Sequence, residues 1–150
     1  MALENPRTTT VFLRDNDPDS KIGVTLPLKV GKNGFFKQSD TLLEQTKSNL
    51  KNLLLTVKGE RVGNPEFGSN IFNLLFENFT TDFAKRLEDE IRLSVANWLP
   101  HVLLNGVIID ARQNDNAVNI TVQYALVTDP NSLESLQLNL TRSGDLYGKR

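Results

Sequence analysis

The sequence has 150 residues, about the length of one domain, and a chain of this size can bury roughly two thirds of its unfolded surface in a single core. With 39% hydrophobic and 23% charged residues, it has the composition of a folded globular protein. Its 17 Lys and Arg against 18 Asp and Glu leave a net charge of -1, which provides no basic face for a nucleic-acid partner. The absence of Cys excludes disulfides, thiol catalysis and thiolate metal sites, and a single His gives little basis for a His-based zinc site or a Ser-His-Asp site.

The chain begins with a polar stretch rich in turn residues. Residues 1–23 show no apolar periodicity and predict an irregular arm. No signal peptide or membrane-spanning segment is predicted, so we expect a soluble protein outside the secretory route, without a membrane partner. Apolar and other residues then alternate over 24–30, which predicts a strand. Because Pro27 cannot donate to a sheet ladder, this strand belongs at an edge or in an extended arm.

An apolar stripe at helical spacing follows and predicts the first helix. We expect Ser39 or Asp40 to cap its start, and Gly59 to end it as a left-handed residue. The stripe consists of Leu43, Thr46, Leu50, Leu53, Leu54 and Val57. The next stretch, 60–69, is rich in Gly and Pro and is predicted to be a loop.

A short second helix is predicted over 71–76, with Ser69 or Asn70 as its cap. This segment is apolar on nearly every side, so we expect it to be covered all round, by its own core or by a partner.

The third predicted helix is longer, starting near Thr80 or Thr81 and ending at Leu99, where Pro100 stops it. Its apolar stripe consists of Phe83, Leu87, Ile91, Val95 and Trp98. On the other face, three pairs of opposite charge are spaced four residues apart, namely Lys85–Asp89, Arg86–Glu90 and Glu88–Arg92.

The last third alternates at period two and predicts an antiparallel three-stranded meander with one apolar face, turning at 114–116 and 129–132. Its apolar positions are Val107, Ile109 and Ala111, then Val118, Ile120, Val122, Tyr124 and Leu126, then Leu136, Leu138 and Leu140. The expected fold class is α+β: two longer helices and a short apolar helix packed on the meander, with an extended N-terminal arm. We expect the arm over 1–23, a single domain over 24–142 and a flexible tail over 143–150.

Two chemical motifs are weak. Gly63 and Gly68 have the spacing of a phosphate loop, but the required Lys is absent, so a helix-to-helix turn is favoured. Carboxylates lie in or beside the same loop, and two of them are candidates for acid and base on a glycoside. They are Glu60, Glu66, Glu77 and Asp82. The simpler interpretation of Glu60 and Glu66 is structural, as partners of Arg61 and of backbone amides.

A proline corner joins the third helix to the first strand of the meander. His101 lies there without a second His or any Cys, so we interpret it as a corner residue rather than a ligand or base. Trp98 is interpreted as a plug of the core beneath the sheet, with an interface anchor as the alternative.

The residues around the glycine loop resemble the signature of the lysozyme-like, GPW-type baseplate wedge proteins of contractile tails, a family shared by tailed phages and type VI secretion baseplates. The likeness extends from about Leu26 to Leu140. The residues that carry it are Leu53-Leu54-Leu55-Thr56, Gly59-Glu60-Arg61, Asn64-Pro65, Phe67-Gly68-Ser69, Ile71 and Leu74-Leu75-Phe76-Glu77.

This resemblance implies a structural subunit of a virion, located in the phage tail baseplate after assembly in the host cytoplasm. It implies several copies in a ring around the tail hub, and no catalytic residue, cofactor or metal. The implied partners are other wedge proteins, hub or tube-initiator proteins, and the sheath protein, whose first ring the subunit would template. The two edges of the meander, together with the arm, also suit interlocking by strand exchange.

One corner departs from the family pattern. The family has an aromatic residue followed by Glu-Pro-Arg, whereas this chain has Trp98-Leu99-Pro100-His101. We therefore expect an apolar partner contact through Leu99 in place of a salt-bridging one. The expected partner-binding residues are Trp98, Leu99, Pro100, His101, Ile71, Phe72 and Phe76. The alternative function is a peptidoglycan hydrolase that uses Glu66 with Glu77 or Glu60.

Overall fold

The computed structural model describes residues 21–31, 36–77, 80–112 and 117–141. The predicted tail and nearly all of the predicted arm lie outside these ranges, as does the predicted turn at 114–116, so the domain boundaries stay predictions. By its internal contacts the chain divides into two compact units, Met1–Ser48 and Asn49–Arg150.

The first unit contains a small antiparallel pair of strands, β1 (Gly23–Val24) and β2 (Gln38–Ser39). The prediction of a longer strand over 24–30 is wrong. Thr25 still donates its amide to Lys37, but the chain then bends at a cis Leu26–Pro27 peptide, and Pro27 has no N–H for the ladder. Among the described residues of this unit, four are buried and all four are polar, and seven large apolar side chains are at least one third exposed. The exposed ones are Ile22, Val24, Leu26, Leu28, Val30, Phe36 and Leu42.

Helix α2 (Leu42–Leu55) begins in the first unit and ends in the second. Its cap is Thr41, one residue beyond the predicted ones, because the Thr41 hydroxyl accepts the Glu44 amide at 3.2 Å. Gly59 does have the expected left-handed conformation, with φ of 92°, but it does not end the helix. It is the third residue of a separate turn, which the Glu60 amide closes on the Val57 carbonyl at 3.1 Å.

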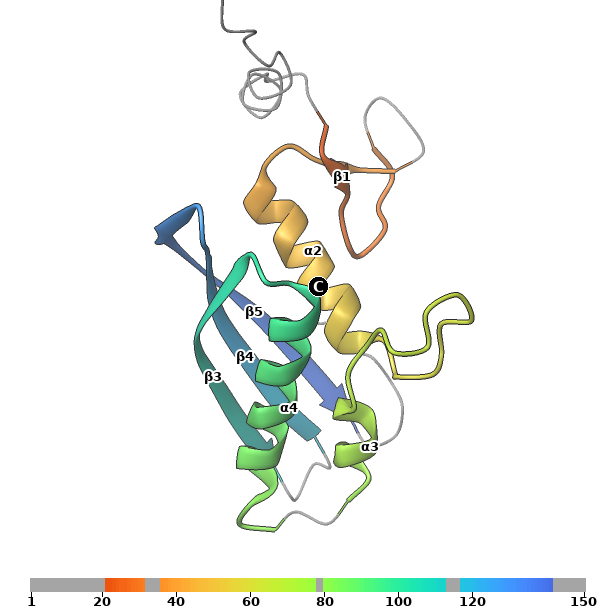
Figure 1. The fold of residues 1–150 in the computed structure, drawn as a ribbon, viewed down its shortest axis with the longest axis vertical. Helices are drawn as coiled ribbons and strands as arrows, with labels where there is room; N and C mark the ends of the chain where they lie inside the picture. Colours follow the sequence, from red (N-terminus) through yellow and green to blue (C-terminus); the bar gives the residue numbers. More distant parts are fainter. Residues whose placement is uncertain (1–20, 32–35, 78–79, 113–116, 142–150) are drawn as a thin grey trace, which may run out of the picture. The chain divides into compact units, whose positions relative to one another are not determined.

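The second unit has the predicted α+β architecture. Strands β3 (Val102–Arg112), β4 (Ala117–Leu126) and β5 (Asp129–Thr141) form an antiparallel sheet in the order β3-β4-β5. Helix α4 (Phe83–Trp98) runs across one face of this sheet, and the short helix α3 (Ile71–Leu75) lies beside α4 (Figure 1).

The core of the second unit is built by the predicted periodicities. On α4, the stripe residues Phe83, Leu87, Ile91 and Val95 are each at most 3% exposed. In the sheet, the alternation on β4 is confirmed, since the side chains at 118, 120, 122 and 124 are at most 1% exposed. The predicted turn at 129–132 is wrong, because Leu126 pairs directly with Asp129 and the strands turn at Val127–Thr128.

The predicted ion pairs on α4 are only partly formed. Glu88 and Arg92 pair at 2.8 Å, but Arg86 pairs with Glu77 instead of Glu90. The core of this chain covers the segment at α3 only in part, so its predicted coverage by a partner stays a prediction. Leu74 and Leu75 are buried, but Phe76, which follows the helix, is 60% exposed.

Candidate partner-binding site at the glycine loop and the end of helix α4

Ser69 fastens the glycine loop to the end of α2. Its amide donates to the Thr56 carbonyl at 2.9 Å, and its hydroxyl donates to the Leu54 carbonyl at 2.8 Å. These carbonyls lie at the end of α2, where the last turn of a helix leaves carbonyls without intrahelical donors. Ser69 is fully buried, so both bonds are shielded from water. The Ser of the family motif is therefore used to cap a helix.

The rest of the loop is closed by its own backbone. The Gly59 amide donates to the Pro65 carbonyl at 2.7 Å, and the Glu60 carboxylate accepts the Val57 amide at 3.3 Å. The contact of Glu60 with a backbone amide agrees with the structural interpretation of that residue. The loop is thus held at both ends and across its middle. Figure 1 shows its course between α2 and α3.

Glu90 of α4 joins three elements. Its Oε1 accepts hydrogen bonds from Lys58 Nζ at 2.8 Å, from the Asn70 amide at 2.9 Å and from the Ser94 hydroxyl at 3.3 Å. Burial raises the pKa of this carboxyl. The hydrogen bonds from Lys58 and Asn70 and the charge of Lys58 together lower it by more than burial raises it, so the pKa lies below its usual value. Glu90 therefore ties the loop and the start of α3 to the middle of α4.

An aromatic stack joins the loop to the end of α4. The rings of Phe67 and Trp98 meet edge to face, with centroids 5.2 Å apart and planes at 68°. The guanidinium carbon of Arg61 lies 4.2 Å from the centroid of the Phe67 ring, a cation–π geometry. Trp98 is half-buried against the loop, so the prediction that it plugs the core beneath the sheet is wrong.

The corner after α4 is a tight turn with Pro100 in its second position, closed by the Val102 amide on the Leu99 carbonyl at 2.9 Å. Pro100 and His101 are exposed. Leu99 is 8% exposed, so its side chain faces the core and leaves little surface for the apolar partner contact expected of it.

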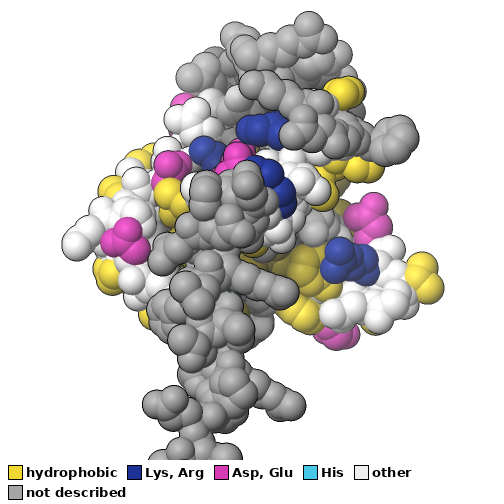
Figure 2. Space-filling model, turned by 90° about the horizontal axis from the view of Figure 1, so that it is seen from above, with side chains coloured by type: hydrophobic (Ala, Val, Ile, Leu, Met, Phe, Trp, Pro, Cys, Tyr) yellow, Lys and Arg dark blue, Asp and Glu magenta, His cyan; other side chains and the backbone are white. Residues whose placement is uncertain are grey.

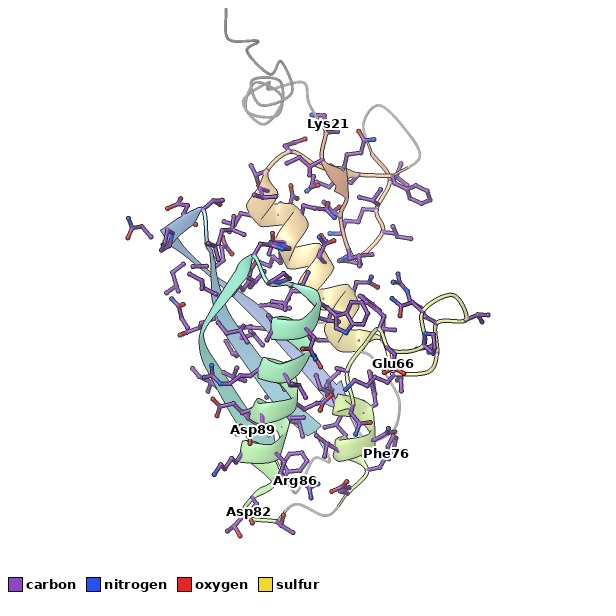
Figure 3. The ribbon with its side chains drawn as sticks, viewed as in Figure 1. Lys21, Glu66, Phe76, Asp82, Arg86 and Asp89 are labelled. Carbon is purple, nitrogen blue, oxygen red and sulfur yellow. The ribbon has the colours of Figure 1, made fainter. Side chains whose placement is uncertain are left out.

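The predicted partner residues fall into two surfaces. The corner surface comprises the predicted Trp98, Pro100 and His101, to which we add Phe67 and Arg61 because the structure places Phe67 against Trp98 and Arg61 against Phe67. The α3 surface comprises the predicted Phe72 and Phe76. The Glu77–Arg86 ion pair holds the chain after α3 near the start of α4, and Figure 3 shows Phe76 and Arg86 in that region. Trp98 lies twelve residues after Arg86, a helical rise of about 18 Å, so the two surfaces are apart. Ile71, also predicted to bind partners, is fully buried in the core.

The loop carboxylates have different surroundings. Glu77 is paired with Arg86, Glu60 accepts a backbone amide, and Glu66 is exposed on the loop, away from Arg86 (Figure 3). Asp82 precedes α4 and is also exposed. Among the described residues, no group of three or more His, Asp or Glu side chains could hold a metal ion. No helix in the described ranges is long and apolar enough to cross a membrane.

The stack and the Glu90 contacts were not predicted from the sequence. Arg61 and Phe67 were recognised only as members of the family motif, and Glu90 was assigned to a different ion pair. Two of the partners lie 31 and 32 residues away in the chain, beyond the reach of helical or strand spacing: Trp98 for Phe67, and Lys58 for Glu90.

Comparison with known proteins agrees with the sequence resemblance. Residues 40–131 match the model of a family described as baseplate wedge protein gp25. The chain belongs to the gp25 family of baseplate wedge proteins. The matched segment covers the loop, both helices after it and most of the sheet, so it includes the corner surface and the α3 surface.

Individual proteins are similar to this chain in sequence or in fold. The chain is 29% identical over 101 residues to baseplate wedge protein gp25 of Enterobacteria phage T4, an alignment that covers 67% of this chain and 76% of the phage protein. Its fold is similar to that of a Geobacter sulfurreducens protein provisionally named a tail lysozyme, with a TM-score of 0.62 and 23% identity over 69% of this chain and 93% of the other.

Two baseplate structures contain chains of the same fold. One is the baseplate of the anti-feeding prophage, with a TM-score of 0.54 and 18% identity over 79% of this chain and 83% of that one. The other is the baseplate of pyocin R2 after contraction, with a TM-score of 0.53 and 18% identity over 66% of this chain and 97% of that one. At these identities the likeness establishes the fold and nothing finer.

Proposed function

We propose that this gp25-family protein is a structural wedge subunit of a contractile tail baseplate, present in several copies around the hub. In this proposal it joins other wedge proteins to the hub or tube-initiator proteins, and it templates the first ring of sheath subunits. The observation that carries the proposal is how the family motif is used. Glu60, Phe67, Gly68 and Ser69 brace a loop against two helices, a structural task that needs no substrate.

The corner surface and the α3 surface supply the exposed groups for such contacts. Trp98 is half-buried, while Pro100, His101 and Phe76 are exposed. Aromatic side chains give large contact area at protein interfaces and often anchor them. Ile71 and Leu99 face the core and leave little surface for a partner.

The sheet offers a further means of assembly. Strands β3 and β5 are its outer strands, with 11 and 13 residues, and each has a neighbouring strand on one side in the described sheet. An outer strand can accept a strand from another chain through main-chain hydrogen bonds. This supports the proposal that sheath and wedge subunits interlock with the protein by strand exchange.

The proposal is tested in the cells that produce the contractile tails, by deleting the gene for this chain and then supplying it again from a plasmid. We expect deletion to abolish sheathed tails in electron micrographs, the wild-type chain to restore them and Trp98→Ala to restore far fewer. Asn97→Ala is the matched control, because Asn97 directly precedes Trp98 and is exposed, and it should restore tails fully. Normal sheathed tails in the deletion strain would refute the structural role.

The hydrolase alternative is motivated by the provisional name of the Geobacter sulfurreducens protein. A zymogram with embedded peptidoglycan separates the two functions. The structural proposal expects no clearing by the wild-type protein, because Glu60 and Glu77, two of the candidate carboxylates, already have structural partners. Clearing by the wild type that disappears in Glu66→Gln would establish the hydrolase instead.

A further inference from the structure

We propose that Arg61 is a preorganised receptor for a carboxylate, an Asp or Glu side chain of the protein that docks on the corner surface. The proposal rests on the proposed function, since it requires that surface to be an interface, and it adds the chemistry of the partner. It is carried by the placement of Arg61 on the aromatic stack and by the absence of an acidic partner within the described chain.

The stack leaves the hydrogen-bonding edge of Arg61 available. Its guanidinium carbon lies over the Phe67 ring, 4.2 Å from the ring centroid, and a guanidinium commonly stacks on an aromatic face in this way. A guanidinium carries five N–H donors in a fixed fork, and a carboxylate can accept two of them in parallel. A ring can attract the cation but cannot accept these hydrogen bonds as an oxygen does.

The described chain does not neutralise this charge. Arg61 is exposed, and among the described residues no carboxylate lies within ion-pair distance of it. Its neighbour Glu60 directs a carboxylate oxygen to the Val57 amide. The sequence-based interpretation that Glu60 or Glu66 pairs with Arg61 is therefore wrong. By contrast, Lys58, Arg86 and Arg92, in the same unit, each pair with a Glu.

The backbone below Arg61 is held in place. The Asn64 amide donates to the Arg61 carbonyl at 3.2 Å, and Ser69 fixes the loop end to α2. Phe67 in turn is held against Trp98. An Arg that is ordered before binding loses less side-chain freedom when a partner arrives, and Arg and Trp are both enriched in interface hot spots.

A single carboxylate fits this site better than a polyanion. Glu60 directly precedes Arg61, Glu66 follows it by five residues, and the net charge of the chain is -1. On the face shown in Figure 2, basic and acidic side chains are intermixed, without a broad basic region. A nucleic acid needs several cations along its backbone, whereas one acidic side chain needs only one fork.

A charge-reversal experiment in the producing cells tests the proposal. Arg61→Glu in the full chain should lower the yield of sheathed tails at least about tenfold, because a partner carboxylate would then face a like charge. Lys85→Glu is the matched control. Lys85 is an exposed cation on α4 with no ion pair among the described residues, and its reversal should leave the yield unchanged. Selection for restored tails with Arg61→Glu should yield suppressors in which an Asp or Glu of another baseplate protein is replaced by Lys or Arg.

Folding and function are separated by two further measurements. The purified Arg61→Glu protein should unfold within about 4 °C of the wild type, because an exposed cation–π contact contributes little to stability. Should it fail to fold, Arg61→Met keeps the contact with Phe67, removes the fork and should also lower the yield. A normal yield with a folded Arg61→Glu, or suppressors confined to this chain, would overturn the proposal. If the gene deletion itself left tails intact, the proposed function would fail as well.

Discussion

Gly68 cannot carry a side chain in its present position. Its φ is +125°, and a Cβ would lie 2.5 Å from the Thr56 carbonyl oxygen, the same oxygen that accepts the Ser69 amide. The glycine of the motif is therefore required by the close approach of two backbones. The sequence shows that a glycine is present here, but the carbonyl that excludes a Cβ comes from twelve residues earlier in the chain.

The loop glycines provide a graded series of variants. Gly68→Ala should lower the free energy of unfolding by about 2 kcal/mol or more, because it combines a steric overlap with an unfavourable φ. Gly59→Ala should cost about 1 kcal/mol, since its φ is +92° but a Cβ there meets nothing within 4 Å. Gly63→Ala, with neither constraint, is the control and should be close to neutral. Urea denaturation of the purified variants measures all three, and equal costs would contradict the role given to Thr56.

Tyr124 buries a hydroxyl that has no hydrogen-bond partner in the described chain. Burial, with a smaller contribution from the charge of Glu134, raises its pKa to about 12, so the hydroxyl is neutral at physiological pH. Its alternation with Val122 and Leu126 predicted a core position, and its exposure of 0% confirms this. The lack of a partner could not be predicted, because contacts between elements decide whether a buried hydroxyl finds a hydrogen-bond partner.

Tyr124→Phe should therefore leave stability unchanged or raise it by about 1 kcal/mol, since it removes a buried polar atom without leaving an unpaired partner. Chemical denaturation at neutral pH measures the change. Tyr124→Ala is the control for packing and should cost about 3 kcal/mol, because it opens a cavity in the core. A clear loss of stability in Tyr124→Phe would show that the hydroxyl has a partner.

Among the elements, α4 and the sheet were the most predictable. Their apolar faces repeat over many residues, so the period of each pattern specifies which side is buried. The strand over 24–30 was mispredicted because alternation reports only the spacing of apolar residues. Pro27 interrupts the ladder, and Leu28 and Val30 are 58% and 88% exposed. The glycine loop has no period, so its position against Trp98 followed from the structure alone.

Glu90 allows the attachment of the loop to be tested through pH. Its folded-state pKa lies below the ordinary value of 4.5, so its ionised form contributes stability above about pH 4.5. That contribution is lost as pH falls through the folded-state pKa, when the carboxyl is protonated in both states. Glu90→Gln should lower the free energy of unfolding by about 1 to 2 kcal/mol at pH 7, because the hydrogen bonds from Lys58 and Asn70 lose their charged acceptor.

Denaturation measured from pH 7 to pH 3 checks this expectation. The difference between the wild type and Glu90→Gln should shrink towards the acid end. Glu88→Gln is the control on the same helix, where an exposed i,i+4 pair with Arg92 should contribute no more than about 0.5 kcal/mol. A pH-independent difference for Glu90 would mean that its role is packing rather than charge.

The whole chain carries a nearly balanced charge and a family domain that starts at residue 40. The polar arm before that domain is the segment that we expect to hold subunits together. Deleting residues 1–23 should leave a folded monomer, because the core of the second unit lies entirely after residue 48. Circular dichroism and cooperative thermal unfolding test the fold, and incorporation into sheathed tails should be lost. An unfolded product would contradict this division of the chain.

The most direct test of the wedge assignment is cryo-electron microscopy of tails purified from the producing cells. The account predicts density for this α+β domain in the baseplate, in several copies around the hub, with the corner surface and a sheet edge in contact with other subunits. Absence of the domain from intact tails, or its presence only away from the wedges and the first sheath ring, would contradict the account.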